Sequence, residues 1–140
     1  MAAIDYSPLG RAIGRLKEGL EALQREPENS LYRDGVIQRF EFTYGLCANM
    51  LKRYLERTEA TAPDSEMTFP TLIRTASEYG LLLSGWDTWS EFRRARNLTS
   101  HGYNEETARQ VLEQIPAFAA EAEFLYSKLE KAQSKDGKQD

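Results

Sequence analysis

The fold class is decided by a long helical pattern, SLYRDGVIQRFEFTYGLCANMLKRYLER, at residues 30–57. Apolar side chains recur in it every three or four residues: Val36, Phe40, Tyr44, Cys47, Leu51 and Leu55. A helix has about 3.6 residues per turn, so this spacing places them on one face. The segment therefore predicts an amphipathic helix that begins near Asn29 or Ser30 and ends near Arg57.

The same period appears before this segment and after it. A first helix is expected to begin at Ser7-Pro8, with Ser7 as a cap, and to end before Pro27. A short helix is expected after Pro70, with Gly80 as its stop. Its inward face is formed by Leu72, Ile73, Ala76 and Tyr79, and the apolar run at residues 81–83 is expected to be a buried linker.

Two further helices complete the pattern. One begins between residues 84 and 87 and runs to about Ser100, with Trp86, Trp89 and Phe92 as anchors. The last begins at Asn104, with acidic residues in its first turn, and Pro116 inside it predicts a kink. No segment predicts a strand.

These elements predict an all-α protein, an up-and-down four-helix bundle with one additional short helix. With 140 residues, the chain has the length of one domain. We expect residues 1–132 to form that domain and residues 133–140 to be a flexible polar tail.

Composition narrows the classes of function. The net charge of −4 excludes nucleic-acid binding through bulk positive charge, so any such binding needs a local basic patch. No apolar run is long enough to cross a membrane, and no basic leader opens the chain. Cys47, the sole cysteine, is expected to be a buried apolar residue, and a cytoplasmic location is expected. One histidine and one cysteine, far apart, predict no metal site, and no cofactor motif is present.

Polar and ionisable side chains are concentrated in one segment, FRRARNLTSHGY, at residues 92–103. The guanidinium of Arg96 matches phosphate oxygens, and His101 titrates near neutrality, so it can move a proton. With RNA, the 2′-hydroxyl can be the nucleophile, and no metal is then required. A purely structural role is the alternative, because arginine and histidine at a helix end often only satisfy the last carbonyl groups.

The spacing inside this segment constrains its geometry. Five residues separate Arg96 from His101, which is about 140° around a regular helix. The two side chains can therefore meet only if the helix unwinds near residues 100–102, or if a second copy of the chain completes the site. Asn97 and His101, four residues apart, would share one face.

Residues 96–103, RNLTSHGY, resemble the Arg-x-x-x-x-His-x-Tyr motif of HEPN proteins, in particular the branch called nucleotidyltransferase substrate-binding proteins. Residues 33–44, RDGVIQRFEFTY, resemble the second helix of the same branch. The likeness spans roughly residues 9 to 130. It departs from the branch at Gly45, Ala48 and Asn49, where Glu, Trp and Lys are common, and Gly45 would permit a close approach of another helix.

The resemblance implies a homodimer and a metal-independent endoribonuclease toxin. It also implies an antitoxin partner, a minimal nucleotidyltransferase (MNT) that silences the toxin by transferring AMP to Tyr103. By position, Arg96 would bind the scissile phosphate, His101 would be the acid–base residue, and Asn97 would orient it. Arg93 and Arg94 would add a basic patch for RNA, or be ordinary surface charges.

Two rival functions remain open at this point. The bundle can be a non-catalytic substrate-binding subunit of a two-component nucleotidyltransferase, with the motif as a phosphate clamp or a modification target. It can also be a structural partner without a ligand. An MNT encoded in the neighbouring gene would favour the first two functions over the third.

Overall fold

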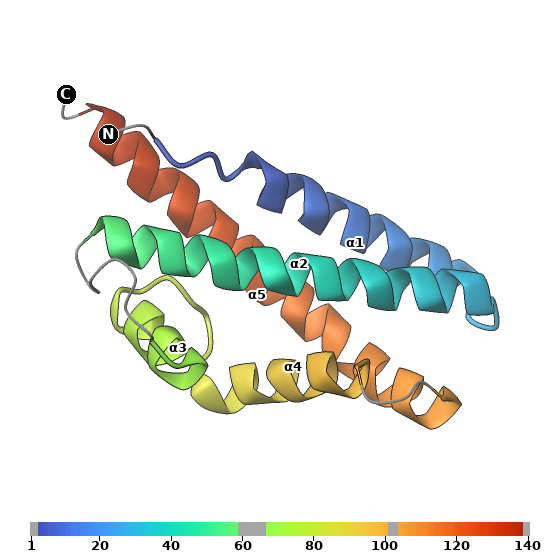
Figure 1. Ribbon diagram of the computed structural model, residues 1–140. Coiled ribbons are helices and arrows are strands. Elements are labelled where there is room, and N and C mark those ends of the chain that lie inside the picture. Colours follow the sequence, from blue (N-terminus) through green and yellow to red (C-terminus); the bar gives the residue numbers. More distant parts are fainter. Residues whose placement is uncertain (1–2, 59–66, 101–103, 139–140) are drawn as a thin grey trace.

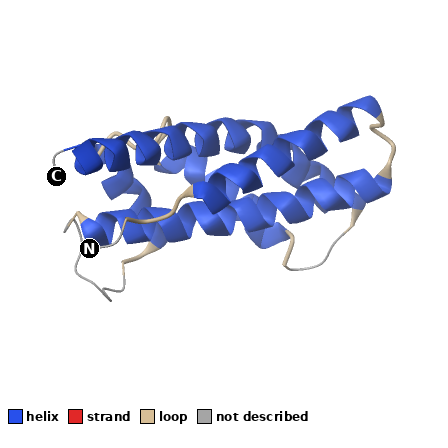
Figure 2. Ribbon diagram, turned by 90° about the horizontal axis from the view of Figure 1, so that it is seen from above, coloured by secondary structure: helices blue, strands red, loops and turns tan. Residues whose placement is uncertain are grey.

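The computed structural model describes residues 3–58, 67–100 and 104–138, with side chains up to residue 133. Within these ranges the chain forms helices and no strand, which confirms the predicted all-α fold (Figures 1 and 2). The helices are α1 (Ser7–Arg25), α2 (Ser30–Arg57), α3 (Phe69–Glu78), α4 (Trp86–Leu98) and α5 (Glu105–Lys138).

Short polar side chains fix where three of the helices begin. The Asn29 side chain accepts the backbone N–H of Tyr32 at 3.1 Å, and Asn104 accepts that of Thr107 at 2.8 Å. The expected cap at Ser7 is wrong, because Ser7 is already the first helical residue. The N-cap residue of α1 is Tyr6, which makes no side-chain cap bond, while Asp5 Oδ1 accepts the Ser7 N–H at 3.0 Å and the Ser7 hydroxyl at 2.7 Å. The third side-chain cap is at α3, where the Thr68 hydroxyl oxygen accepts the backbone N–H of Thr71 at 3.3 Å.

The four long helices, α1, α2, α4 and α5, alternate in direction and form a bundle around α2 and α5 (Figure 1). α1 packs on both of these helices from one side, and α4 packs on both from the other. α1 and α4 make no contact with each other. The short helix α3 lies against α2 and α4 at one end of the bundle. The bundle with one additional short helix is therefore as predicted.

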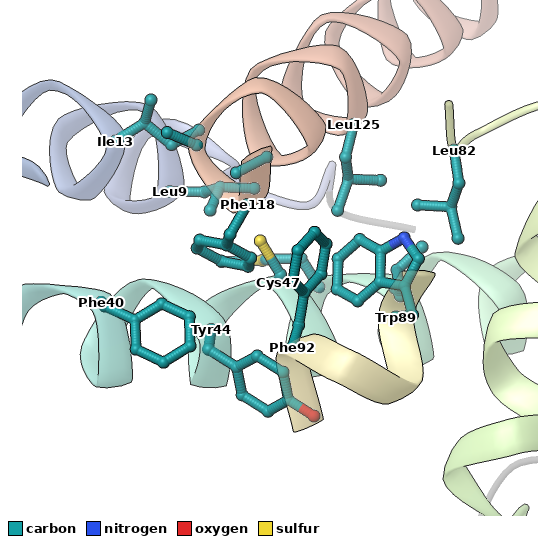
Figure 3. Close-up of a cluster of buried hydrophobic side chains, with 14 of the residues drawn as sticks. Leu9, Ile13, Phe40, Tyr44, Cys47, Leu82, Trp89, Phe92, Phe118 and Leu125 are labelled. Atoms are coloured by element: carbon teal, nitrogen blue, oxygen red, sulfur yellow. The ribbon is translucent and has the colours of Figure 1, made fainter. Parts of the chain in front are cut away.

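An aromatic cluster forms the centre of the core (Figure 3). The ring of Phe118 on α5 lies 5.1 Å from that of Phe40, 5.4 Å from Phe92 and 6.1 Å from Trp89. Edge-to-face contacts such as these stabilise beyond the area that they bury. Cys47 is fully buried beside them, as expected, and burial raises the pKa of its thiol.

The short-helix region differs from the prediction in two places. Tyr79 is 48% exposed, because α3 ends at Glu78 and the chain turns away at Gly80, whose φ is +74°. Leu81 and Leu82 are buried, as predicted for the linker, but Leu83 is 57% exposed. Among the described residues, no helix is long and apolar enough to cross a bilayer.

Candidate functional site

The apolar side of α4 positions the motif. Trp89, Phe92 and Ala95 are buried against the core, three residues apart in each step. This spacing turns Arg93 and Arg94, which lie between Phe92 and Ala95, and Arg96, which follows, outward, where all three are exposed. The local sequence thus holds a row of cations on a helix that cannot rotate without exposing its aromatic side chains.

A buried carboxylate fixes the same helix from the other side. Glu121 on α5 is only 3% exposed, and its Oε2 accepts the indole N–H of Trp89 and the backbone N–H of Leu83, both at 3.3 Å. Glu121 was not predicted as a structural residue, because charged side chains on an amphipathic helix usually face the solvent. The available signal was its register: Glu121 lies three residues after Phe118 and four before Leu125, on the inward face.

Residues of the motif satisfy the end of α4. The Thr99 hydroxyl donates to the carbonyl of Arg96 at 2.7 Å, and the Ser100 N–H donates to the carbonyl of Asn97 at 3.1 Å. Nη1 of Arg96 donates to the Ser100 hydroxyl oxygen at 3.2 Å. α4 ends at Leu98 and residues 99 and 100 form a turn, so the described part of the motif leaves the helix before position 101.

Arg93 lies over an aromatic ring of α3, and the charges of Arg93 and Arg96 both act on Tyr44 of α2. The Arg93 guanidinium is 5.6 Å from the ring centre of Phe69, whose ring is 5.8 Å from that of Tyr44. Burial raises the pKa of Tyr44 to about 12, and the nearby charges of Arg93 and Arg96 act in the opposite direction. We call these four residues, Tyr44, Phe69, Arg93 and Arg96, the α4 arginine face.

Tyr44 and Phe69 in this face were not predicted as site residues. Tyr44 belongs to the apolar stripe of α2 and was therefore interpreted only as core. The signal that could have identified it is its position at the end of the second family-like block, residues 33–44.

Arg94 is separated from the α4 arginine face. It lies 4.0 Å from Glu91, and together they line a groove of about 330 Å³ between α4 and α5, to which Glu113 also contributes. The two carboxylates offset the charge of Arg94. By contrast, neither Arg93 nor Arg96 has a carboxylate partner among the described residues.

The remaining predicted site residues, His101 and Tyr103, lie outside the described residues. Asn97 is described and is exposed at the last turn of α4, beside Arg96. Within the described ranges, no group of three or more His, Cys, Asp and Glu side chains is placed to hold a metal ion.

Residues 4–131 match the family model described as nucleotidyltransferase substrate binding protein like. The chain belongs to this family. The match includes every helix start and the whole of the α4 segment, so the predicted family, the nucleotidyltransferase substrate-binding branch of the HEPN proteins, is confirmed.

Two relatives from Haemophilus influenzae illustrate the similarity. The chain is 38% identical to a protein named probable ribonuclease HepT. That alignment covers 96 residues, which are 68% of this chain and 65% of that protein. This chain therefore covers slightly less than two thirds of that relative's length. A solved structure, described as the fold of a substrate-binding domain of a nucleotidyltransferase, superposes with a TM-score of 0.81 at 30% identity. That comparison covers 90% of this chain and 99% of the other.

Proposed function

We propose that this protein is a HEPN-type, metal-independent endoribonuclease that acts as a toxin and cleaves RNA in the cleft of a homodimer. The observation that carries the proposal is the pair of exposed arginines at the end of α4, Arg93 and Arg96. They have no carboxylate partner among the described residues. Arg93 lies over the Phe69 ring, and the charges of both arginines act on Tyr44. Similarity to a protein named probable ribonuclease HepT supports it.

In this mechanism the RNA 2′-hydroxyl oxygen attacks the adjacent phosphorus, and the bond from phosphorus to the 5′-oxygen breaks. Arg96 binds the phosphate oxygens and offsets the charge that develops on them. His101 moves the proton between the attacking and leaving oxygens, and Asn97 orients it. The products are a 2′,3′-cyclic phosphate and a free 5′-hydroxyl.

Silencing would come from an MNT partner. The phenolic oxygen of Tyr103 attacks the α-phosphorus of ATP, pyrophosphate leaves, and the phenol loses its proton. The AMP group then adds bulk and a negative charge two residues from His101. That charge competes with RNA for Arg96 and repels the phosphate backbone.

The decisive experiment is RNA cleavage by the purified, unmodified protein in EDTA. We expect wild type to cut, leaving 2′,3′-cyclic phosphate ends, and Arg96→Ala to cut about 100- to 1,000-fold more slowly. His101→Ala should be similarly slow. Arg94→Ala is the matched control on the same helix and should stay near wild type. If wild type does not cut while mass spectrometry finds Tyr103 unmodified, the ribonuclease proposal fails.

A second candidate is the non-catalytic substrate-binding subunit of a two-component nucleotidyltransferase. The family description and the solved structure from Haemophilus influenzae both favour it. Expression without the MNT partner separates the two. A toxin should arrest growth and His101→Ala should relieve the arrest, whereas a substrate-binding subunit should be harmless at high expression.

A further inference from the structure

A second basic site lies on the other side of α2 from the α4 arginine face. A groove of about 560 Å³ runs between α1 and α2. Its charged lining residues are three arginines, Arg11, Arg15 and Arg39, and no lining residue is acidic. We call it the α1–α2 groove. Since α1 and α4 do not touch, it is separate from the motif, as the positions of α1, α2 and α4 in Figure 1 show.

The charge of this groove is unusual for the chain. Acidic residues outnumber basic ones by 22 to 18, so three arginines without a lining carboxylate stand against the overall balance. Arg39 donates to the carbonyl of Arg15 at 2.7 Å and lies 3.9 Å from Glu18 at the edge of the groove. Arg11 donates to the Ser7 hydroxyl oxygen at 3.2 Å. Arg15 is exposed and has no carboxylate partner among the described residues.

An aromatic side chain completes the groove. Phe42 lines it and is 65% exposed, although it sits on a helix whose neighbouring apolar side chains are buried. Guanidinium groups match phosphate oxygens, and an exposed ring offers a surface on which a base can stack. Cations combined with an exposed ring are the chemistry by which proteins bind single-stranded nucleic acid.

From this combination we infer that the α1–α2 groove binds single-stranded RNA at a distance from the reacting phosphate. Its role in holding substrate rests on the proposed ribonuclease function. Phe42, Thr43 and Tyr44 are consecutive on α2: the first two line the groove, and Tyr44 belongs to the α4 arginine face. A strand bound in the groove therefore needs to cross only α2 to reach Arg93 and Arg96.

The test measures binding without cleavage. A fluorescent 2′-O-methyl oligonucleotide lacks the nucleophilic hydroxyl, so fluorescence anisotropy reports affinity alone. We expect Arg11→Gln/Arg15→Gln to raise the Kd about tenfold. We also expect it to reduce the slope of log K against log salt by about 1.4, which is two phosphate contacts at about 0.7 each. Phe42→Ala should raise the Kd about fivefold or more.

A control variant with the same change in net charge separates the effect of the groove from the effect of bulk charge. Lys52→Gln/Lys131→Gln removes two exposed cations outside the groove and should leave the Kd within about twofold. Equal binding by wild type and the groove variant would overturn the inference, and so would absence of RNA binding by wild type. So would a free mononucleotide that binds as tightly as the oligonucleotide, because the ligand would then not be a strand.

Oligomeric state distinguishes a protein partner from RNA. If the groove variant changes mass in light scattering while its RNA affinity stays unchanged, the surface joins copies of this chain and the RNA inference fails. The ribonuclease proposal can fail separately. If wild type cuts no RNA but its binding still depends on Arg11 and Arg15, the groove inference stands and the catalytic proposal does not.

Discussion

In the first half of α4, Trp89 and Phe92 are buried, and the Trp89 indole is tied to Glu121 on a different helix. In the second half, Arg93 and Arg96 are exposed, and the hydrogen bond of Arg96 goes to a residue four positions along the chain. One helix thus combines the large buried anchors of its first half with exposed cations in its second half, where Ala95 continues the buried side. A substitution of the anchors would break buried contacts, whereas the exposed charges can be reached by a ligand.

This difference separates stability from activity. Substitutions in the anchored half should lower the free energy of unfolding, because they remove buried contacts. Substitutions of the exposed arginines in the second half should leave it nearly unchanged and act on RNA instead. If substitutions of either kind changed both the free energy of unfolding and the action on RNA, the two halves of α4 would not be distinct.

The largest effect is expected at Trp89. Its replacement by alanine removes ring contacts at 5.2 Å to Phe92 and 6.1 Å to Phe118, and also the donor to Glu121. We expect Trp89→Ala to lower the free energy of unfolding by about 3–5 kcal/mol, measured by urea denaturation. Trp86→Ala, at a half-buried position on the same helix, should cost clearly less. Equal losses would contradict the assignment of the anchor to Trp89.

A titration at Tyr44 probes the boundary between the two halves, since its ring meets both the core and the α4 arginine face. Its pKa is about 12 in the folded protein and about 10 when unfolded. Between these values the unfolded chain loses the proton first. The free energy of unfolding should therefore fall, by up to about 1.4 kcal/mol per pH unit, as pH rises from 10 to 12.

Tyr44→Phe isolates this contribution. The variant lacks the ionising hydroxyl, so its stability should fall less steeply than that of wild type over the same pH range. Urea denaturation at several pH values measures both slopes, and the other tyrosines cancel in the difference. Parallel slopes would show that Tyr44 is not buried as the structure has it.

The sequence was sufficient for the fold because helical periodicity and end signals agree. The stripe from Val36 to Leu55 predicted α2, and Asn29 and Asn104 predicted where α2 and α5 begin. The sequence predictions were wrong where a local pattern did not match the folded structure. Tyr79 continued the apolar period of α3, but the helix had already ended, so its side chain is exposed.

The candidate site was less predictable. Composition indicated one basic group, Arg93, Arg94 and Arg96, yet Arg94 lies beside Glu91. Arg93 lies over the Phe69 ring, and the charges of Arg93 and Arg96 act on Tyr44. That division depends on which helices flank α4, and spacing within one helix does not contain this information. Gly45 is similar: among the residues that the structure describes, nothing lies within 4 Å of a Cβ built there, so no described helix approaches closely at this glycine.

A smaller effect is expected at Glu121. Glu121→Leu leaves the Trp89 and Leu83 N–H groups without their acceptor, which should cost about 1–3 kcal/mol in urea denaturation. Glu121→Gln keeps a carbonyl acceptor and should retain most of the stability. Glu123→Leu, two residues along α5, removes only a half-exposed pair with Lys17 and should cost less than about 1 kcal/mol. Equal costs at positions 121 and 123 would mean that the buried carboxylate does not anchor α4.

The smallest effect compares two neighbouring arginines. Arg93→Gln should slow RNA cleavage about two- to fivefold, because one exposed charge near a phosphate contributes about 0.5–1 kcal/mol. Arg94→Gln should leave the rate nearly unchanged, since Glu91 and Glu113 already offset that cation and it lies toward α5. Both variants lose one positive charge from the same exposed turn, so bulk charge cannot explain a difference between them. Rates measured at two salt concentrations sharpen the comparison: the deficit of Arg93→Gln should shrink as salt screens the contact. If Arg94→Gln is the slower enzyme, RNA approaches α4 from the α5 side, and Tyr44 and Phe69 are then core residues with no part in the site.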